Sequence, residues 1–360
     1  MSQRIYGLDI VRATAILTVV YWHAFLNLGI PAMKRYSIGD GVSIFFVLSG
    51  FLIGKILLNI INKPSFNFGD LKNFWFRRWM RTLPAYFFVL SLLIIYQTTT
   101  GPEYFSDYFH YYFFTQSFFY NGGKLYPESW SLCIEEWFYL IMPVLFILSF
   151  KFSKTALLVC IFLIIAACTI LTFIRAGATS NADQWEVYVR QATITRFDSI
   201  MYGILGAWFS YYHLWKQRKT LFVVGLTSYA AITLYNDLAG FTWVAKYLSL
   251  PIQSISVLLT LRFLENIKTG KGIIYRAITF ISIISYSMYL LCFTPFQIIH
   301  SKLLVSLNTT STAVSFFLYV IVTFGGAYLM NTLIEKPFMN LRDVRRRKKE
   351  HDRSNKHVTE

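Results

Sequence analysis

Apolar runs of about 20 residues recur from one end of the chain to the other, and they constrain its fold more than any other feature. A run of this length crosses the roughly 30 Å hydrocarbon core of a bilayer as one α-helix. Only 14% of the 360 residues are charged, whereas soluble domains carry about 25%. The two-residue alternation typical of membrane β-barrels is weak here. The sequence therefore predicts an all-α, polytopic membrane helix bundle.

We expect about ten transmembrane helices in this bundle. Lys and Arg gather in alternate connections between the apolar runs, and cytoplasmic connections carry an excess of both. This pattern places the N- and C-termini in the cytoplasm. The aromatic connection 101–127 is expected outside, with an interfacial or re-entrant helix as the alternative. The expected spans are 8–30, 41–61, 83–99, 134–150, 155–175, 193–213, 220–236, 242–264, 277–298 and 313–334.

The domain organisation is expected to be simple, with one membrane domain over residues 1–341 and a disordered basic cytoplasmic tail at 342–360. The first apolar run is long and carries polar residues, so we expect no cleavable signal peptide. The net charge of +16 comes from residues between spans, which indicates topology and contact with anionic lipid rather than nucleic acid. The four cysteines lack metal-ligand spacing and are expected to pack, so no metal site is predicted.

Two ionisable residues interrupt the first span, Arg12 and His23. They are eleven residues apart, which at about 100° per residue puts both on one face, roughly 16 Å apart along the axis. If Arg12 lies near the cytoplasmic surface, His23 lies near mid-membrane, where an ionisable group normally faces a bundle interior or a wet cavity. The alternatives are an imidazole that only bonds a neighbouring helix and an arginine that extends to the surface. Asp9 is expected to pair with Arg12.

Small residues mark the second span at Ser49, Gly50 and Gly54. Such residues let another helix approach closely, so packing is the first expectation. Close approach of the backbone to a substrate is the alternative.

Three arginines, Arg77, Arg78 and Arg81, gather among aromatic residues in what we expect to be a cytoplasmic loop before the third span. Arg78 and Arg81 are three residues apart and share a face. Guanidinium groups bind phosphate through paired hydrogen bonds, which fits a phosphate-bearing cytoplasmic cosubstrate. Plain anchoring at the membrane surface explains them equally well.

The segment 128–143 carries Ser131, Glu135 and Tyr139 at four-residue spacing, on one helix face, whereas Glu136 points elsewhere. Glu135 is either solvated or serves as a proton acceptor or an orienting partner for an imidazole. Further candidates for substrate contact or support lie in later spans. They are Arg196 and Asp198, each expected to find a partner elsewhere in the fold, and Tyr286.

Taken in order, LDIVRATAILTVVYWH, GVSIFFVLSGFLI, FRRWMR, SWSLCIEEWFYL, RFDSIMYG, ISYSMYLL and IEKPF resemble the type-3 acyltransferase family of integral membrane proteins. The resemblance covers nearly the whole chain. It implies a bundle of about ten helices and an acyl-coenzyme A donor. It also implies essential roles for the residues matched by Arg12, His23, Arg78, Arg81 and Glu135.

Two positions depart from the family pattern. Ser43 stands where the family often has an acidic residue, and Cys292 stands where it often has a histidine. Larger relatives add a soluble esterase-like domain after the last span. The short basic tail here resembles the stand-alone form.

The resemblance implies an O-acyltransferase of the bacterial cytoplasmic membrane that moves an acyl group, acetyl first, from acyl-coenzyme A to a hydroxyl of a surface or lipid-linked glycan. No tightly bound cofactor is expected. Coenzyme A phosphates would contact Arg78 and Arg81, with Arg77 in reach, and Arg12 would orient the donor or stabilise charge near the thioester. His23 would act as general base or carry the acyl group, with Glu135 orienting His23 or the sugar. The alternative is a transporter or flippase, against which the chain shows no repeated halves.

Overall fold

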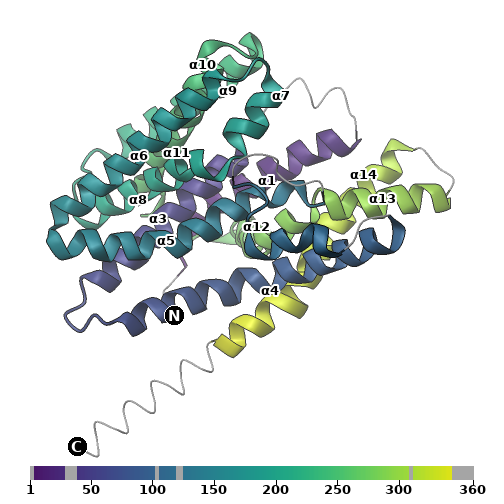
Figure 1. Ribbon diagram of the computed structural model, residues 1–360, viewed down its shortest axis with the longest axis horizontal. Helices are drawn as coiled ribbons and strands as arrows, with labels where there is room; N and C mark the ends of the chain where they lie inside the picture. The colour runs from purple at the N-terminus through teal and green to yellow at the C-terminus, as the bar shows by residue number, and fades with distance from the viewer. Residues whose placement is uncertain (1–3, 29–38, 102–104, 119–124, 308–310, 343–360) are drawn as a thin grey trace, which may run out of the picture.

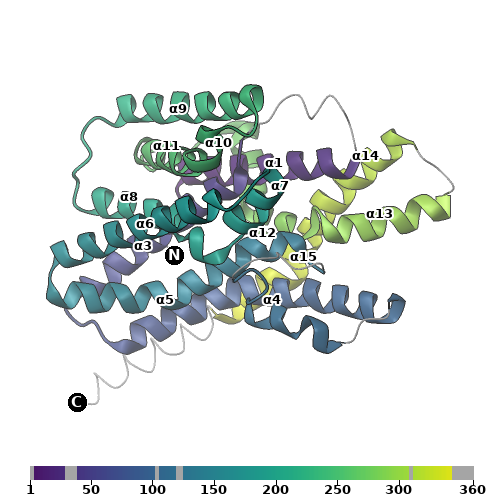
Figure 2. The ribbon, with the colours of Figure 1, turned by 45° about the horizontal axis from the view of Figure 1, so that its top comes forward.

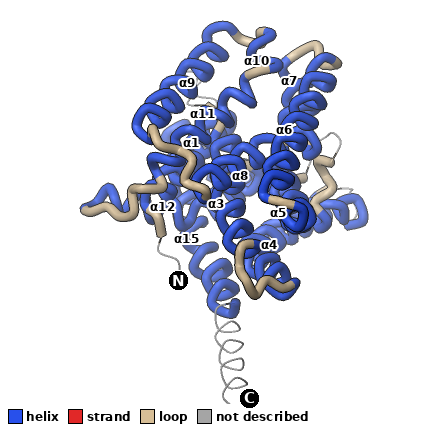
Figure 3. Tube along the Cα trace, turned by 90° about the vertical axis from the view of Figure 1, so that its left-hand side faces the viewer, coloured by secondary structure: helices blue, strands red, loops and turns tan. Residues whose placement is uncertain are grey.

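The computed structural model describes residues 4–28, 39–101, 105–118, 125–307 and 311–342. These ranges form helices and turns without a strand, which confirms the expected all-α class (Figure 1, Figure 3). The predicted tail 342–360 lies outside the described residues, apart from Arg342.

The bundle begins with two long helices, α1 (Tyr6–Leu28) and α3 (Gly41–Ile61), and the longest, α4 (Phe68–Thr100), follows. The remaining elements are η1 (Phe105–Phe113), η2 (Pro127–Ser129), α5 (Trp130–Phe152), α6 (Lys154–Gly177), α7 (Ala182–Trp185), η3 (Glu186–Arg190), η4 (Thr193–Thr195), α8 (Phe197–Tyr211), α9 (Arg218–Ala239), α10 (Trp243–Tyr247), α11 (Ser249–Leu264), α12 (Gly272–Leu291), α13 (Thr294–Leu307), α14 (Thr312–Val320), η5 (Ile321–Gly326), α15 (Ala327–Met330) and η6 (Asn331–Glu335).

Eight helical stretches among the described residues are long and apolar enough to cross a membrane, and α11 is a shorter apolar helix. The protein is thus a multi-pass membrane protein. The number of ten spans and the cytoplasmic position of both termini stay predictions. In Figure 2, α9 and α4 lie on opposite sides of the bundle, with α1, α3 and α8 between them.

Small residues bring α3 and α8 together. A side chain at Gly50 would place its Cβ 1.9 Å from the carbonyl oxygen of Ile200, and one at Gly203 would lie 2.1 Å from that of Val47. Gly54 faces Ala207 in the same interface. The packing role expected for Gly50 and Gly54 is confirmed, because only residues without a side chain allow the two backbones this close.

The predicted loop around the arginine cluster is wrong, because α4 begins at Phe68 and carries the cluster within the helix. The cause is a capping box before the apolar run. The Asn67 side chain accepts from the backbone N–H of Gly69, and the Asp70 side chain accepts from that of Asn67. These bonds satisfy amide groups that a helix start leaves free. Arg78 and Arg81 therefore point from a regular helix.

Two other predicted spans are interrupted. The span 242–264 divides at Leu248 into α10 and α11. The span 277–298 ends as α12 at Leu291 and restarts as α13 at Thr294. Pro295 explains this second break, because proline has no N–H to continue α12 but fits the first turn of a new helix.

The aromatic segment η1 packs against the middle of α4. The Tyr86 hydroxyl donates to the carbonyl of Tyr111 over 3.0 Å, and the rings of Phe87 and Tyr112 stack with centroids 5.6 Å apart. The connection therefore contains a 3₁₀ helix packed on α4, and its position outside the membrane stays a prediction.

Candidate active site

A pocket with about 620 Å³ of empty space, part of it open to solvent, lies where α1, α3, α4, α5 and α12 meet. We call it the arginine pocket. Seven of the residues singled out from the sequence line it, although they come from five different helices, and one of them is Ser49. The other six are Arg12, Arg78, Arg81, Ser131, Glu135 and Tyr286.

Arg12 and Arg81 both line this pocket without a hydrogen bond or ion pair to any other described residue. The expected pairing of Asp9 with Arg12 is wrong. Asp9 instead accepts from Arg4 over 2.6 Å and from the Ser282 hydroxyl over 2.8 Å. Because Arg4 and Ser282 fill the hydrogen-bonding capacity of the Asp9 carboxylate, the guanidinium of Arg12 lines the pocket without pairing with Asp9.

Arg78 has an anionic partner of its own. Its Nη2 lies 3.3 Å from Oε2 of Glu135, and its guanidinium lies 4.0 Å from the ring centre of Tyr139, whose hydroxyl it also contacts. The Ser49 hydroxyl donates to Oε1 of Glu135 over 2.9 Å. Glu135 and Tyr139 reach Arg78 together because four-residue spacing puts them on one face of α5, as predicted.

Arg77 is separated from the other two arginines by the helix itself. Its side chain is exposed and does not line the arginine pocket, whereas Arg78, the next residue, does. Consecutive residues of a helix point about 100° apart, which accounts for the difference. Its predicted contact with the donor stays a prediction.

His23 lies outside the arginine pocket but is joined to its lining. The imidazole Nδ1 is 3.0 Å from Sγ of Cys292, and the ring lies 4.8 Å from that of Phe293. The Cys292 thiol in turn contacts the carbonyl of Tyr289, a residue that lines the pocket. Glu135 is bonded to Ser49 and Arg78, so in this structure it does not orient His23.

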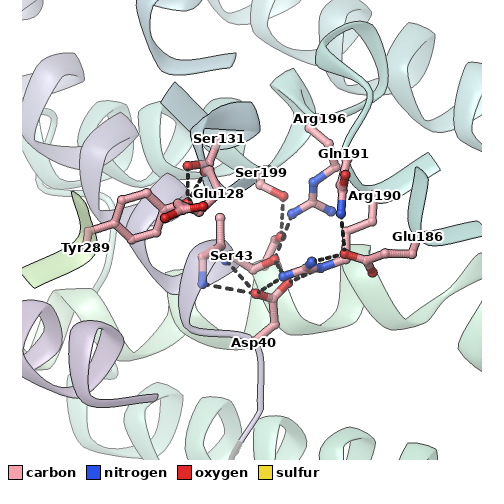
Figure 4. A network of polar contacts seen from close by, with 12 residues as sticks. Asp40, Ser43, Glu128, Ser131, Glu186, Arg190, Gln191, Arg196, Ser199 and Tyr289 are labelled. Atoms are coloured by element: carbon pink, nitrogen blue, oxygen red, sulfur yellow. Dashed lines mark hydrogen bonds and ion pairs between the residues drawn. The ribbon is translucent and has the colours of Figure 1, made fainter. Parts of the chain in front are cut away.

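A buried polar network adjoins the pocket at the start of α3, and it contains residues that the sequence analysis did not single out (Figure 4). Arg190 donates to Asp40 over 2.9 Å and also contacts Glu186. Asp40 accepts from the Ser43 hydroxyl over 2.7 Å, and Ser43 accepts from Arg196 over 2.7 Å. An Asp directly before an apolar run is an N-cap signal that could have identified Asp40.

This network places an acidic residue beside Ser43, the position at which the family often has one. Asp40 stands three residues earlier, caps α3 through the amides of Val42 and Ser43, and reaches the Ser43 hydroxyl. Burial would raise the pKa of the Asp40 carboxyl, but the charge and hydrogen bonds of Arg190 outweigh burial and hold that pKa well below its ordinary value. The carboxylate is therefore charged and fixed.

The remaining candidates have supporting positions. Arg196 is fully buried, and its Nε and Nη1 have no partner among the described residues. Asp198 bonds to the adjacent Ser199, so the expectation of a partner elsewhere is confirmed for Arg196 and wrong for Asp198. The Tyr286 hydroxyl donates to the carbonyl of Thr82 over 2.9 Å.

A second, larger and mainly aromatic pocket lies between α4, η1 and α5. Glu136 lines it and is 8% exposed, on a different side of α5 from Glu135, as expected. Its Oε1 accepts from Thr82 over 3.1 Å, and its Oε2 has no partner among the described residues. Since Thr82 also lines the arginine pocket, Thr82 and Glu136 form part of the wall between the two pockets.

Several bacterial proteins are similar to this chain. It is 33% identical to the peptidoglycan O-acetyltransferase OatA of Listeria monocytogenes and 32% identical to the putative peptidoglycan O-acetyltransferase YrhL of Bacillus subtilis. Each match covers 41% of this chain and 25% of the relative. A putative O-acetyltransferase of Staphylococcus aureus strain COL is 26% identical over 92% of this chain and 57% of the relative.

The chain thus spans between a quarter and just over half of the length of these relatives. No solved structure matches it. The sequence model of the family described as an acyltransferase domain matches residues 5–332, which include the whole arginine pocket and His23. The chain therefore belongs to this family of type-3 acyltransferases.

Proposed function

We propose that this protein is an integral membrane O-acyltransferase, which transfers an acyl group from acyl-coenzyme A to a hydroxyl of a surface or lipid-linked glycan. Acetyl is the acyl group we expect first, because the relatives are named O-acetyltransferases. Two of them are named for peptidoglycan, so a bacterial cell-wall glycan is the acceptor to test first.

One observation carries the donor side of the proposal, namely two arginines of the pocket that have no anionic partner among the described residues. Burying a charged group without a partner costs several kcal/mol, so such groups are kept where a ligand supplies the opposite charge. Arg12 and Arg81 offer this to a phosphate-bearing donor, and guanidinium groups suit phosphate because their N–H groups bind it in pairs. The positive charge of Arg78 is partly compensated, because Glu135 is its ion-pair partner.

We infer the following reaction. Donor phosphates bind at Arg81 and Arg12 on the cytoplasmic side, and the thioester end extends along the pocket toward Ser131 and Tyr289. His23 accepts the proton of the glycan hydroxyl as its oxygen attacks the thioester carbonyl carbon. The carbon–sulfur bond then breaks, an ester forms, and coenzyme A leaves as the thiolate, which takes up a proton. This arrangement suits the bacterial cytoplasmic membrane, where the donor is inside and the glycan is outside.

The experiment uses purified protein in sealed vesicles with radiolabelled acetyl-coenzyme A on one side and peptidoglycan fragments on the other. We expect label to appear in the glycan as an ester that mild alkali removes. His23→Ala should abolish this transfer, whereas His300→Ala should not. His300 is the matched control because, among the described residues, its imidazole hydrogen-bonds only to Ser315, which lies in α14.

Two results would contradict the proposal. One is a His23→Ala protein that folds and still transfers label at the wild-type rate. The other is movement of intact donor or glycan across the vesicle without ester formation, which would support the transporter alternative instead.

A further inference from the structure

The break between α12 and α13 brings two consecutive residues against one imidazole. Cys292 approaches Nδ1 of His23, and Phe293 covers its ring. Asn27, one turn after His23 on α1, donates to the backbone carbonyl of Cys292 over 3.4 Å. The break between α12 and α13 therefore packs against α1 at His23, the residue that we propose as the base.

A buried glutamate fixes the restart of the helix. Glu128 is 4% exposed and accepts from both the backbone N–H of Thr294, over 2.8 Å, and its hydroxyl, over 2.6 Å. These bonds replace the ones that α12 would have made at this point. The position of Cys292 is thus set by Asn27 on one side and by the bonds of Glu128 to Thr294 on the other. The thiol itself is fully buried.

The hydrogen bonds of the thiol decide which nitrogen of His23 carries the proton. A thiol has one proton to donate. The Sγ of Cys292 lies 3.5 Å from the carbonyl oxygen of Tyr289, which can only accept, so the thiol proton belongs to that contact. The 3.0 Å contact between Sγ and Nδ1 then needs the proton of the imidazole, with sulfur as acceptor.

We propose that Cys292 is a positioning residue that holds His23 in the tautomer with the proton on Nδ1, so that Nε2 keeps its lone pair for the acceptor hydroxyl. Nε2 has no partner among the described residues, so it is free for this role. The inference rests on the proposed function, in which His23 is the general base. It gives the reaction an orienting group in the place where the second partner of a catalytic histidine usually stands.

The first test reads the tautomer without any substrate. Nitrogen-15 NMR of the full chain in a bilayer, labelled at histidine, separates a protonated ring nitrogen from a bare one. A spectrum of His23→Gln identifies the signal among the six histidines. We expect the proton on Nδ1 in the wild type and a shift toward Nε2 in Cys292→Ala. Cys292→Ser should keep the wild-type tautomer, because a hydroxyl donates and accepts in the same way.

The second test reads catalysis with the same variants. Cys292→Ala should lower kcat about tenfold or more, part of what a general base contributes, while the KM for the donor stays unchanged. Cys292→Ser should restore most of kcat. Cys168→Ala is the matched control, since Cys168 is also buried but its thiol bonds the carbonyl of Ile194 in η4 rather than His23.

Three results would overturn the inference: a wild-type proton on Nε2, a Cys292→Ala protein with unchanged tautomer and kcat, or acyl label recovered on Cys292 as a thioester. The tests also separate the two proposals. A wild type that transfers no acyl group but shows the Nδ1 proton lost in Cys292→Ala contradicts the function and leaves the tautomer assignment standing.

Discussion

Nη2 of Arg78 lies 3.3 Å from Oε2 of Glu135, so one of the three guanidinium groups in the arginine pocket already has an anion beside it. The two side chains come from neighbouring helices, α4 and α5, and both are largely buried, with 20% and 13% of their side-chain surface exposed. A donor that enters the pocket therefore meets Glu135 as well as the arginines, and the effects of changing the two residues should depend on each other.

Arg78→Gln leaves Glu135 as an unpaired negative charge in the pocket. We expect this single variant to bind coenzyme A more weakly than the double variant Arg78→Gln with Glu135→Gln. Coupling energies of residues in contact are about 0.5–3 kcal/mol. Calorimetric binding of coenzyme A to the wild type, both single variants and the double variant measures the coupling. Strictly additive effects would show that the pair does not act on the donor.

Asp40→Asn should destabilise the protein by about 3–5 kcal/mol, the usual cost of removing one partner from a buried ion pair. Arg190 is that partner, and it would keep its charge in the network with Glu186 as its remaining carboxylate among the described residues. Thermal unfolding in detergent measures the loss. Lys63→Gln is the control, because its ion pair with Asp70 is exposed and such pairs contribute about 0–1 kcal/mol. Equal melting temperatures for the two variants would argue against a structural role of the network.

The same pair predicts how stability depends on pH. The pKa of Asp40 is lowered in the folded state because the charge of Arg190 outweighs the effect of burial. The stabilisation is therefore complete above the unfolded pKa of about 3.9 and is lost as the pH falls further. The free energy of unfolding of the wild type should fall as the pH drops below about 4. Asp40→Asn should be less stable at neutral pH, and its stability should change less with pH. Parallel curves for both proteins would contradict the shift.

Gly50→Ala should separate α3 from α8, since a Cβ at this position would lie 1.9 Å from the carbonyl oxygen of Ile200, a backbone atom that cannot turn away. Overpacking of this kind costs about 1–3 kcal/mol. Thermal unfolding is again the measurement. Gly325→Ala serves as the control, because nothing lies within 4 Å of the new Cβ there. A wild-type melting temperature for Gly50→Ala would mean that the helices are not held this close.

The sequence predicted those features that depend on local order. The span 41–61 coincides with α3, whose apolar run begins directly after the capping residue Asp40. The shared face of Glu135 and Tyr139 was also predictable, because helical spacing alone sets it. The sequence analysis did not predict the start of α4, because the capping box of Asn67 and Asp70 lies in a polar segment outside the apolar run. It also did not predict the helix break at Cys292, although Pro295 is a signal for such a break.

Contacts between distant segments were not predictable from one sequence. Asp40 and Arg190 are 150 residues apart, and His23 and Cys292 are 269 apart. Asp9 found Arg4 rather than Arg12, because Ser282 from α12 completes its hydrogen bonds. In each case the packing of the helices determines which residue becomes the partner. The spacing of residues along a single helix does not predict this packing.

The most direct test of the account is the affinity of the reconstituted protein for coenzyme A when one free guanidinium of the pocket is removed. A hydrogen bond to a charged group contributes about 1.5–3 kcal/mol. Arg12→Gln and Arg81→Gln should therefore each weaken binding about 10- to 100-fold. Arg77→Gln, which changes an exposed arginine on the same helix as Arg81, should have a much smaller effect. Wild-type affinity in both pocket variants would contradict the claim that these two arginines bind the donor.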